Sequence, residues 1–195
     1  LTAGVERDER KRNVLSIRQA SWREKNDETS YRVELRRSMS ATLNGAVSYV
    51  HSDRGGSEYL PANNNTAADF IDPVHFADRN RRKLRASLDW TPTEAVSLQA
   101  LFDDSRDTYD GRPLGPQSGK ARFYSLDGTV SLSDNWQATV WLSNDQNRIQ
   151  QATITGSNTT LIAAQTWQTS LRSRGKAHGV GIAGRTSEKL QIGID

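Results

Sequence analysis

A charged hairpin near the middle of the chain constrains the fold more than any other feature. In residues 81–90, apolar side chains occupy every second position, and charged or hydroxyl side chains occupy the positions between them. After a turn that contains Pro92, residues 96–103 alternate in the same way. Period two predicts two antiparallel strands, each with one apolar and one polar face. What lies against each face is the question that this pattern leaves open.

The same hairpin pattern recurs along the chain, in residues 31–49, 120–142 and 179–194. Recurrent strand pairs with short turns of similar chemistry predict an all-β, antiparallel up-and-down meander of about nine strands. No intervening segment has a helical period, which argues against parallel βαβ folds. Leu1 is not expected to be a natural start, and residues 192–195 end inside a strand pattern. We therefore expect residues 1–195 to be a segment of a single, larger β-barrel domain.

The connections between hairpins are expected to be longer than the turns within them. Long outer loops are predicted near residues 54–78, 106–119 and 151–169, the last including Leu161 to Trp167, whereas the hairpin turns are short. This asymmetry is typical of outer-membrane barrels, whose periplasmic turns are short. The alternating cores run to about ten residues, the length of a tilted membrane strand. Aromatic side chains near strand ends resemble interfacial girdles: Tyr31, Trp90, Phe102, Tyr124, Trp136 and Trp141.

Two environments can explain the two faces. In a soluble β-sandwich, the apolar face would pack against a second sheet; in a membrane barrel, it would face lipid while the charged face lines a lumen. The many charges of both signs favour a wide, transmembrane outer-membrane barrel. We expect Leu84, Leu88, Val96 and Leu98 to face lipid. The side chains expected to face the lumen and contact a partner are Arg32, Glu34, Arg36, Lys83, Arg85, Asp89 and Asp103.

Composition and spacing argue against most catalytic and metal sites. The absence of Cys excludes disulfides, thiol catalysis and covalently attached haem. Asp103, Asp104, Asp107 and Asp110 do not have EF-hand spacing, which favours a solvated acidic loop over a Ca²⁺ site. The three histidines, at 51, 75 and 178, are far apart and are expected to bind neither zinc nor haem. No catalytic signature is present, and we expect no enzyme.

The basic cluster of residues 79–85 could in principle bind nucleic acid. Its alternation with Leu84, Ala86 and Leu88 argues instead for one face of a strand, so no nucleic-acid partner is expected. The Gly179, Gly181 and Gly184 spacing does not open a helix after a strand, so it is not a dinucleotide site.

Several segments resemble the MtrB/PioB family of decahaem-associated outer-membrane β-barrels. The resemblance lies in residues 82–92 with the region through Leu98 and residues 107–110, in the hairpin 31–49 with residues 52–59, in residues 126–128, and in the hairpin 179–194. The family implies a porin-like barrel in the outer membrane of Gram-negative bacteria. Such a barrel carries no cofactor itself, because the haem belongs to its partner.

The resemblance implies that the barrel sheaths a periplasmic multihaem c-type cytochrome in its lumen and supports electron transfer across the outer membrane. Outer-membrane lipid would surround the barrel, and an extracellular cytochrome is a second partner that the family allows. A passive porin or receptor-type barrel for small solutes is the alternative membrane function. A soluble all-β binding module is a third possibility, which would need no detergent.

Overall fold

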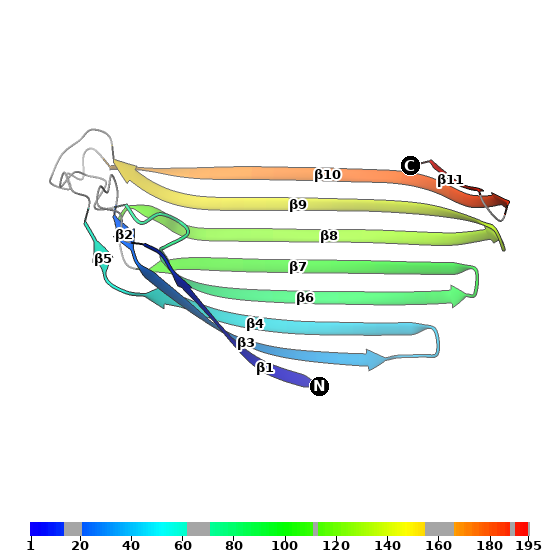
Figure 1. The fold of residues 1–195 in the computed structure, drawn as a ribbon, viewed down its shortest axis with the longest axis horizontal. Helices are drawn as coiled ribbons and strands as arrows, with labels where there is room; N and C mark the ends of the chain where they lie inside the picture. Colours follow the sequence, from blue (N-terminus) through cyan, green and yellow to red (C-terminus); the bar gives the residue numbers. More distant parts are fainter. Residues whose placement is uncertain (14–20, 62–70, 111–112, 155–165, 188–189, 195) are drawn as a thin grey trace.

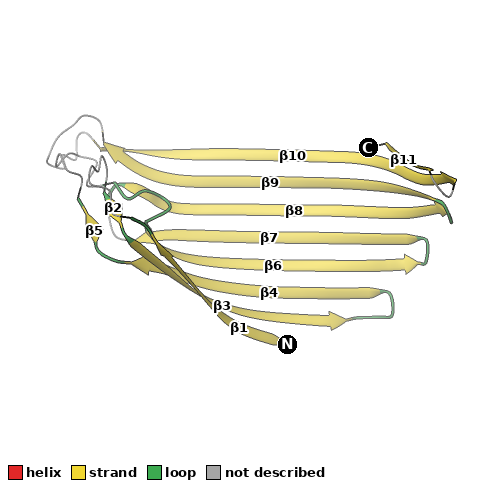
Figure 2. Ribbon diagram, in the orientation of Figure 1, coloured by secondary structure: helices red, strands yellow, loops and turns green. Residues whose placement is uncertain are grey.

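The chain folds into one long antiparallel sheet. The computed structural model describes residues 1–13, 21–61, 71–110, 113–154, 166–187 and 190–194. Nine strands pair in chain order, and no described residue is helical (Figures 1 and 2). The all-β, up-and-down meander predicted from the alternation is confirmed. The strands of this sheet are β1 (Thr2–Lys11), β3 (Lys25–Ser38), β4 (Leu43–Gly56), β6 (Asp78–Thr93), β7 (Val96–Asp110), β8 (Gly115–Ser133), β9 (Trp136–Ile154), β10 (Thr166–Ser187) and β11 (Leu190–Ile194).

The sheet is a single open layer. The strands β1 and β11 each pair with one neighbour, so both are edges. The two short strands β2 (Trp22–Arg23) and β5 (Tyr59–Leu60) form a separate pair at the end of the sheet opposite the short hairpin turns (Figure 1). No second sheet covers either face among the described residues. Each face of this sheet therefore meets solvent, lipid or another molecule.

The strands are longer than the sequence pattern predicts. From β3 to β10 they run from 14 to 22 residues, whereas the alternating cores suggested about ten. The predicted loop at 106–119 is wrong for the same reason, because β7 continues to Asp110 and β8 already begins at Gly115. In these extensions, polar residues occupy both faces, so hydrophobic alternation cannot reveal the strand. Antiparallel backbone pairing nevertheless continues, since it needs no particular side chain.

The other two long connections lie between well-defined strands. One joins Gly56 to Asp78 and includes β5. The other joins Ile154 to Thr166. In the predicted excursion from Leu161 to Trp167, residues 161–165 lie outside the described residues, while Thr166 and Trp167 open β10.

A compact cap closes the end of the sheet opposite the hairpin turns. Its centre is Phe76, which is 2% exposed. The Trp22 ring meets Phe76 edge-on at 4.9 Å, and the Arg12 guanidinium lies 4.8 Å from the centre of the same ring. The Asn26 side chain donates a hydrogen bond of 3.0 Å to the Phe76 carbonyl. The cap therefore joins the connection that precedes β6 to strand β3.

The turn between β7 and β8 also belongs to the cap. Leu114 is 2% exposed and forms an isolated bridge with Ile71. Gly115 has a φ of 97°, and a Cβ there would lie 2.5 Å from the carbonyl oxygen of Asp72. Only glycine fits both the dihedral angle and the close backbone approach. A Gly-Pro pair therefore opens β8 at this point, and the ladder shifts register just after Pro116.

Candidate functional site

All seven side chains predicted to face a lumen lie on one side of the sheet. Antiparallel partners directly opposite each other point to the same face. Glu34 on β3 is in register with Ser48, Arg85 and Asp103 through β4, β6 and β7. The other predicted residues fall at even spacing from these: Arg32, Arg36, Lys83 and Asp89. We call this side the charged face.

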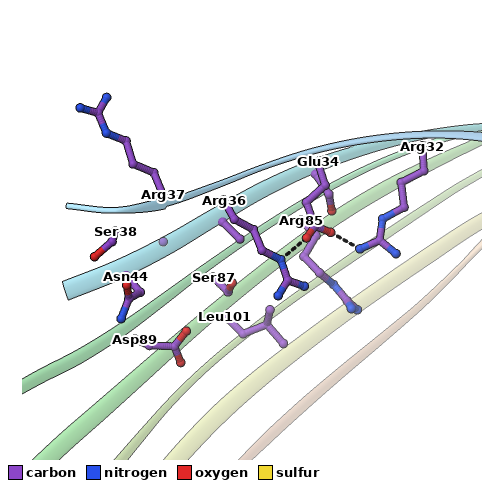
Figure 3. A pocket seen from close by; sticks show the side chains of 13 residues that line it. Arg32, Glu34, Arg36, Arg37, Ser38, Asn44, Arg85, Ser87, Asp89 and Leu101 are labelled. Carbon is purple, nitrogen blue, oxygen red and sulfur yellow. Dashed lines mark hydrogen bonds and ion pairs between the residues drawn. The ribbon is translucent and has the colours of Figure 1, made fainter. Parts of the chain in front are cut away.

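Glu34 is the most enclosed carboxylate of the charged face. Its side chain is 9% exposed, and both of its oxygens accept hydrogen bonds, one from Arg32 and one from Arg36. Figure 3 shows the two guanidinium groups turned toward Glu34, whereas Arg37, the next residue along β3, points away from them. The alternation of the strand places two cations beside one carboxylate, because positions 32, 34 and 36 share a face.

Further ion pairs extend the charged face across β6 and β7. The Arg85 guanidinium donates two hydrogen bonds of 2.8 Å to Asp103, and the Lys83 ammonium lies 3.4 Å from the same carboxylate. Arg81 makes a similar two-point contact with Asp107, with both distances 2.7 Å. Such paired Arg–carboxylate bonds fix geometry as well as charge.

The charged face is nearly balanced in charge. From β3 to β9 it carries seven cations and seven carboxylates. The cations are Arg32, Arg36, Arg54, Arg79, Arg81, Lys83 and Arg85, and the carboxylates are Glu28, Glu34, Asp89, Asp103, Asp107, Asp127 and Asp145. Most of them pair within the sheet. The exposed Asp89 is an exception, since no ion pair joins it to a described residue.

An open hollow of about 560 Å³ lies on the charged face near the hairpin turn of β3 and β4. Arg36, Glu34 and Arg85 line one part of it, and Asp89 with Leu101 lines another (Figure 3). The hollow contains charges of both signs and no nucleophile with an adjacent base. Its chemistry suits the recognition of another surface better than a reaction.

The opposite side of the sheet carries the predicted apolar set. Leu84 and Leu88 are 42% and 39% exposed, while Val96 and Leu98 are half-buried. Leu98 packs within the sheet over Gly128 of the neighbouring strand. Among the residues that the structure describes, no second layer packs over these side chains, as a soluble sandwich would require. We call this side the apolar face.

The apolar face ends at a border that crosses the strands diagonally. Tyr31 marks the border on β3 and is in register, through every strand between them, with Arg172 on β10. On β10, however, apolar residues begin only after His178, six residues farther along. The border therefore moves about 20 Å along the strand direction between β3 and β10. These strands are six inter-strand spacings of about 4.8 Å apart, so a border parallel to the membrane plane implies a strand tilt of about 35–40°. This tilt matches that of outer-membrane barrels.

Aromatic side chains lie along the two margins of the apolar face, with one correction. Tyr31, Tyr49, Phe102 and Tyr124 follow the border, and Trp90 and Trp136 lie near the hairpin turns. Trp141 does not join them. It is in register with Asp127 and Gly179, so it lies on the charged face, and its ring covers Gly179. Trp141 alternates with the apolar residues of β9 and falls on the same face as Thr139 and Ser143, which indicates the charged face. Its aromatic side chain alone suggested a lipid-facing girdle position.

The acidic cluster does not form a loop or a cation site. Residues 103–110 belong to strand β7, so Asp103 and Asp107 point to the charged face while Asp104 and Asp110 point to the other. The three histidines lie on β4, in the cap and on β10. Within the part of the chain that the structure describes, no three His, Asp or Glu side chains converge as metal ligands. Across the same residues, no helix has the length and apolarity to cross a membrane.

Comparison with known proteins agrees with this arrangement of faces. No curated protein matches the chain. The family model of the outer membrane beta-barrel porin MtrB/PioB, in contrast, matches residues 1–195, the whole chain. That family is a family of porin-like barrels rather than of enzymes, and its members reside in the bacterial outer membrane. The chain therefore belongs to the MtrB/PioB family of outer-membrane β-barrels.

Proposed function

We propose that this chain forms part of the wall of a wide barrel that sheaths a multihaem c-type cytochrome and supports electron transfer across the outer membrane. The haem would belong to the cytochrome in the lumen and not to this chain. The observation that carries the proposal is the charged face. Because the apolar face meets lipid in an outer-membrane barrel, the charged face must line the lumen.

The pattern of charge on this face suits a folded partner. A small-solute filter works through a field of one dominant sign at a constriction, whereas seven cations and seven carboxylates here nearly cancel from β3 to β9. The two-point pairs of Arg85 with Asp103 and of Arg81 with Asp107 hold their side chains in fixed positions. A surface with fixed, alternating charges can match a complementary protein surface with little loss of side-chain entropy.

The width of the sheet supports a large lumen. Nine strands at about 4.8 Å spacing and a tilt of about 40° cover about 50 Å of circumference. The sheet does not close over that arc. Barrel diameter grows with strand number, so a barrel that contains this sheet is wider than nine strands would make it.

A passive porin is the second candidate, and the cap favours it. The Arg54 guanidinium, on the charged face of β4, donates hydrogen bonds to the carbonyls of Ala77 and Val74 at 3.0 and 2.7 Å. The segment before β6 is therefore held against the charged face at the outer end of the sheet. A segment folded inward in this position would narrow a water-filled lumen, as a solute-selective pore requires.

The deciding experiment extracts the full-length barrel in mild detergent from cells that produce it with their own cytochromes. We expect haem absorbance to elute with the barrel at a fixed ratio. We also expect the complex, when reconstituted in liposomes, to pass electrons from a donor outside the liposome to a dye enclosed within it, so that the dye is reduced. Flux of small sugars through barrels that carry no haem would support the porin instead and would refute the sheath.

A charge variant tests the face directly. Asp89→Lys reverses an exposed charge that no described side chain neutralises, so the fold should tolerate it. We expect the haem retained per barrel to fall several-fold. Thr108→Lys adds a cation at an exposed position on the other face of β7 and should leave haem retention unchanged. Equal retention by both variants would show that the charged face makes no contact with the cytochrome.

A further inference from the structure

Beyond the border, the apolar face becomes strongly basic. The strands β6 to β10 continue past the last outward-facing apolar residues, and eight of the outward positions there hold cations. We call these residues the basic belt: Arg82, Arg106, Lys120, Arg122, Arg148, Arg172, Arg174 and Lys176. All but Arg122 are exposed, and the Arg122 side chain is itself 38% exposed.

Five of these cations form one row across five adjacent strands. Arg82, Arg106, Lys120, Arg148 and Arg172 are successive register partners from β6 to β10. Directly opposite residues have Cβ atoms about 5 Å apart, and like charges at that spacing repel. A row of like charges on adjacent strands is therefore unfavourable unless anions lie against it.

The protein supplies few anions for the belt. Asp104 pairs with Arg106 at 3.3 Å and with Arg122 at 3.1 Å. For Lys120, Arg148 and Arg172, no ion pair reaches any carboxylate within the described ranges. Together with Arg122 and Arg174, these three line a hollow of about 510 Å³ on the outer surface.

The charged face of the same strands shows that this imbalance is specific to the belt. There, Arg81 and Arg85 each have a two-point carboxylate partner, and Asp103 contacts two cations. The two faces share the same backbone and differ only in parity. The unneutralised positive charge therefore lies on the side that meets lipid, immediately beyond the apolar residues.

We propose that the basic belt binds the phosphate groups of anionic lipids in the outer leaflet of the outer membrane. The belt is continuous with the lipid-facing surface, and its first members lie within a few residues of the border, at the depth of lipid headgroups. Short hairpin turns mark the periplasmic end of such barrels, so the belt lies at the outer side. Guanidinium groups bind phosphate by paired, charge-assisted hydrogen bonds, and membrane-surface anions attract clustered Lys and Arg.

The test uses the full-length barrel, stripped of lipid in a neutral detergent and mixed with defined lipids. Native mass spectrometry then counts the lipids retained. We expect retention of lipid A, with two phosphates, to exceed that of its monophosphoryl form, and phosphatidylcholine to be retained least. Equal retention of the three lipids would overturn the proposal without any variant. If inorganic phosphate displaces lipid A completely, the belt binds free phosphate rather than a lipid surface, and the proposal is also overturned.

Matched variants locate the binding. The double variant Arg82→Gln/Lys120→Gln removes the two exposed cations of the row that lie two and four residues beyond the border residues Leu84 and Tyr124, and it should weaken lipid A binding about tenfold, about threefold for each exposed contact. Arg32→Gln removes an exposed cation from the charged face while Arg36 still neutralises Glu34. It should retain lipid A as the unaltered barrel does. Parallel losses in both variants, or capture of an acidic protein with no change in lipid retention, would refute the assignment.

Discussion

Arginine substitutions at successive positions of β6 test the assignment of the two faces. Ala86 lies on the apolar face between Leu84 and Leu88, and its cross-strand partners are Val47 and Phe102. No carboxylate lies opposite it. An arginine placed at this position of an outer-membrane barrel is surrounded by lipid and apolar side chains, except for Asp104, which lies diagonally across on β7 and already pairs with Arg106 and Arg122.

The expected cost follows from depth in the membrane. Ala86 is four residues from the girdle residue Trp90, which is about 13 Å along a strand and about 10 Å of depth at a tilt of about 40°. On β6 the apolar side chains run from Trp90 to Leu84, and Ala86 lies opposite the border residue Phe102, so arginine at Ala86 should cost about 1–3 kcal/mol, between the values for the interface and for the midplane. Leu88 is two residues from Trp90, as Ala86 is two residues from Leu84, so Leu88→Arg should cost about the same, 1–3 kcal/mol, for the charge.

The control is the residue between them. Ser87 lies on the charged face beside the open hollow, so Ser87→Arg should cost less than about 1 kcal/mol. The assay is reversible urea unfolding of the full-length barrel, without its partner, in phospholipid vesicles, followed by tryptophan fluorescence. An equal loss of unfolding free energy for Ala86→Arg and Ser87→Arg would refute the assignment of faces.

Two further predictions concern the charged face and the cap. Gly179→Val should displace the Trp141 ring, because a Cβ there would lie 2.7 Å from it. The emission spectrum should shift, whereas Gly4→Val, with no atom within 4 Å, should leave it unchanged. In the cap, burial and then the Arg12 charge lower the pKa of His75. The unfolded chain therefore binds this proton first as pH falls, so the cap should lose stability below about pH 6.5. Hydrogen exchange of residues 71–77 from pH 8 to pH 5, corrected for the intrinsic exchange rate at each pH, measures this, and protection factors that do not fall on acidification contradict it.

Part of this architecture could be predicted from sequence because alternation reports parity. Once Leu84 is assigned to the apolar face, its neighbour Arg85 lies on the charged face, and the antiparallel register places Glu34 and Asp103 on that same face. The structure places all seven predicted charged residues on this one face. Membership of the MtrB/PioB family was likewise predicted and is confirmed. The identity of each ion-pair partner was not predictable. Arg81 meets Asp107 because of the register of β6 against β7, and period two does not specify register.

The full length of the strands could not be predicted, because the alternation of apolar and polar residues is lost where both faces of a strand are polar. The strand β1 (Thr2–Lys11) is exposed throughout and has only Val5 as a large apolar residue, so its sequence gives no clear period. The end of β7 and the start of β8 likewise have polar residues on both faces, so their sequence predicts a loop instead of a strand. Composition is therefore a guide to where a strand lies in the bilayer rather than to where the strand ends.

The distribution of charge between the two faces leads to a distinction that salt can test. The chain has a formal net charge of +3, yet the charged face of β3 to β9 nearly cancels, while the basic belt has eight cations and one paired carboxylate, Asp104. Attraction between a cationic belt and lipid phosphate is screened as ionic strength rises. A neutral face instead recognises a partner through the arrangement of its charges, whose contacts are close and are therefore screened less by salt than attraction over longer distances. Raising the salt concentration should therefore release anionic lipid from the barrel well before it releases a cytochrome from the lumen.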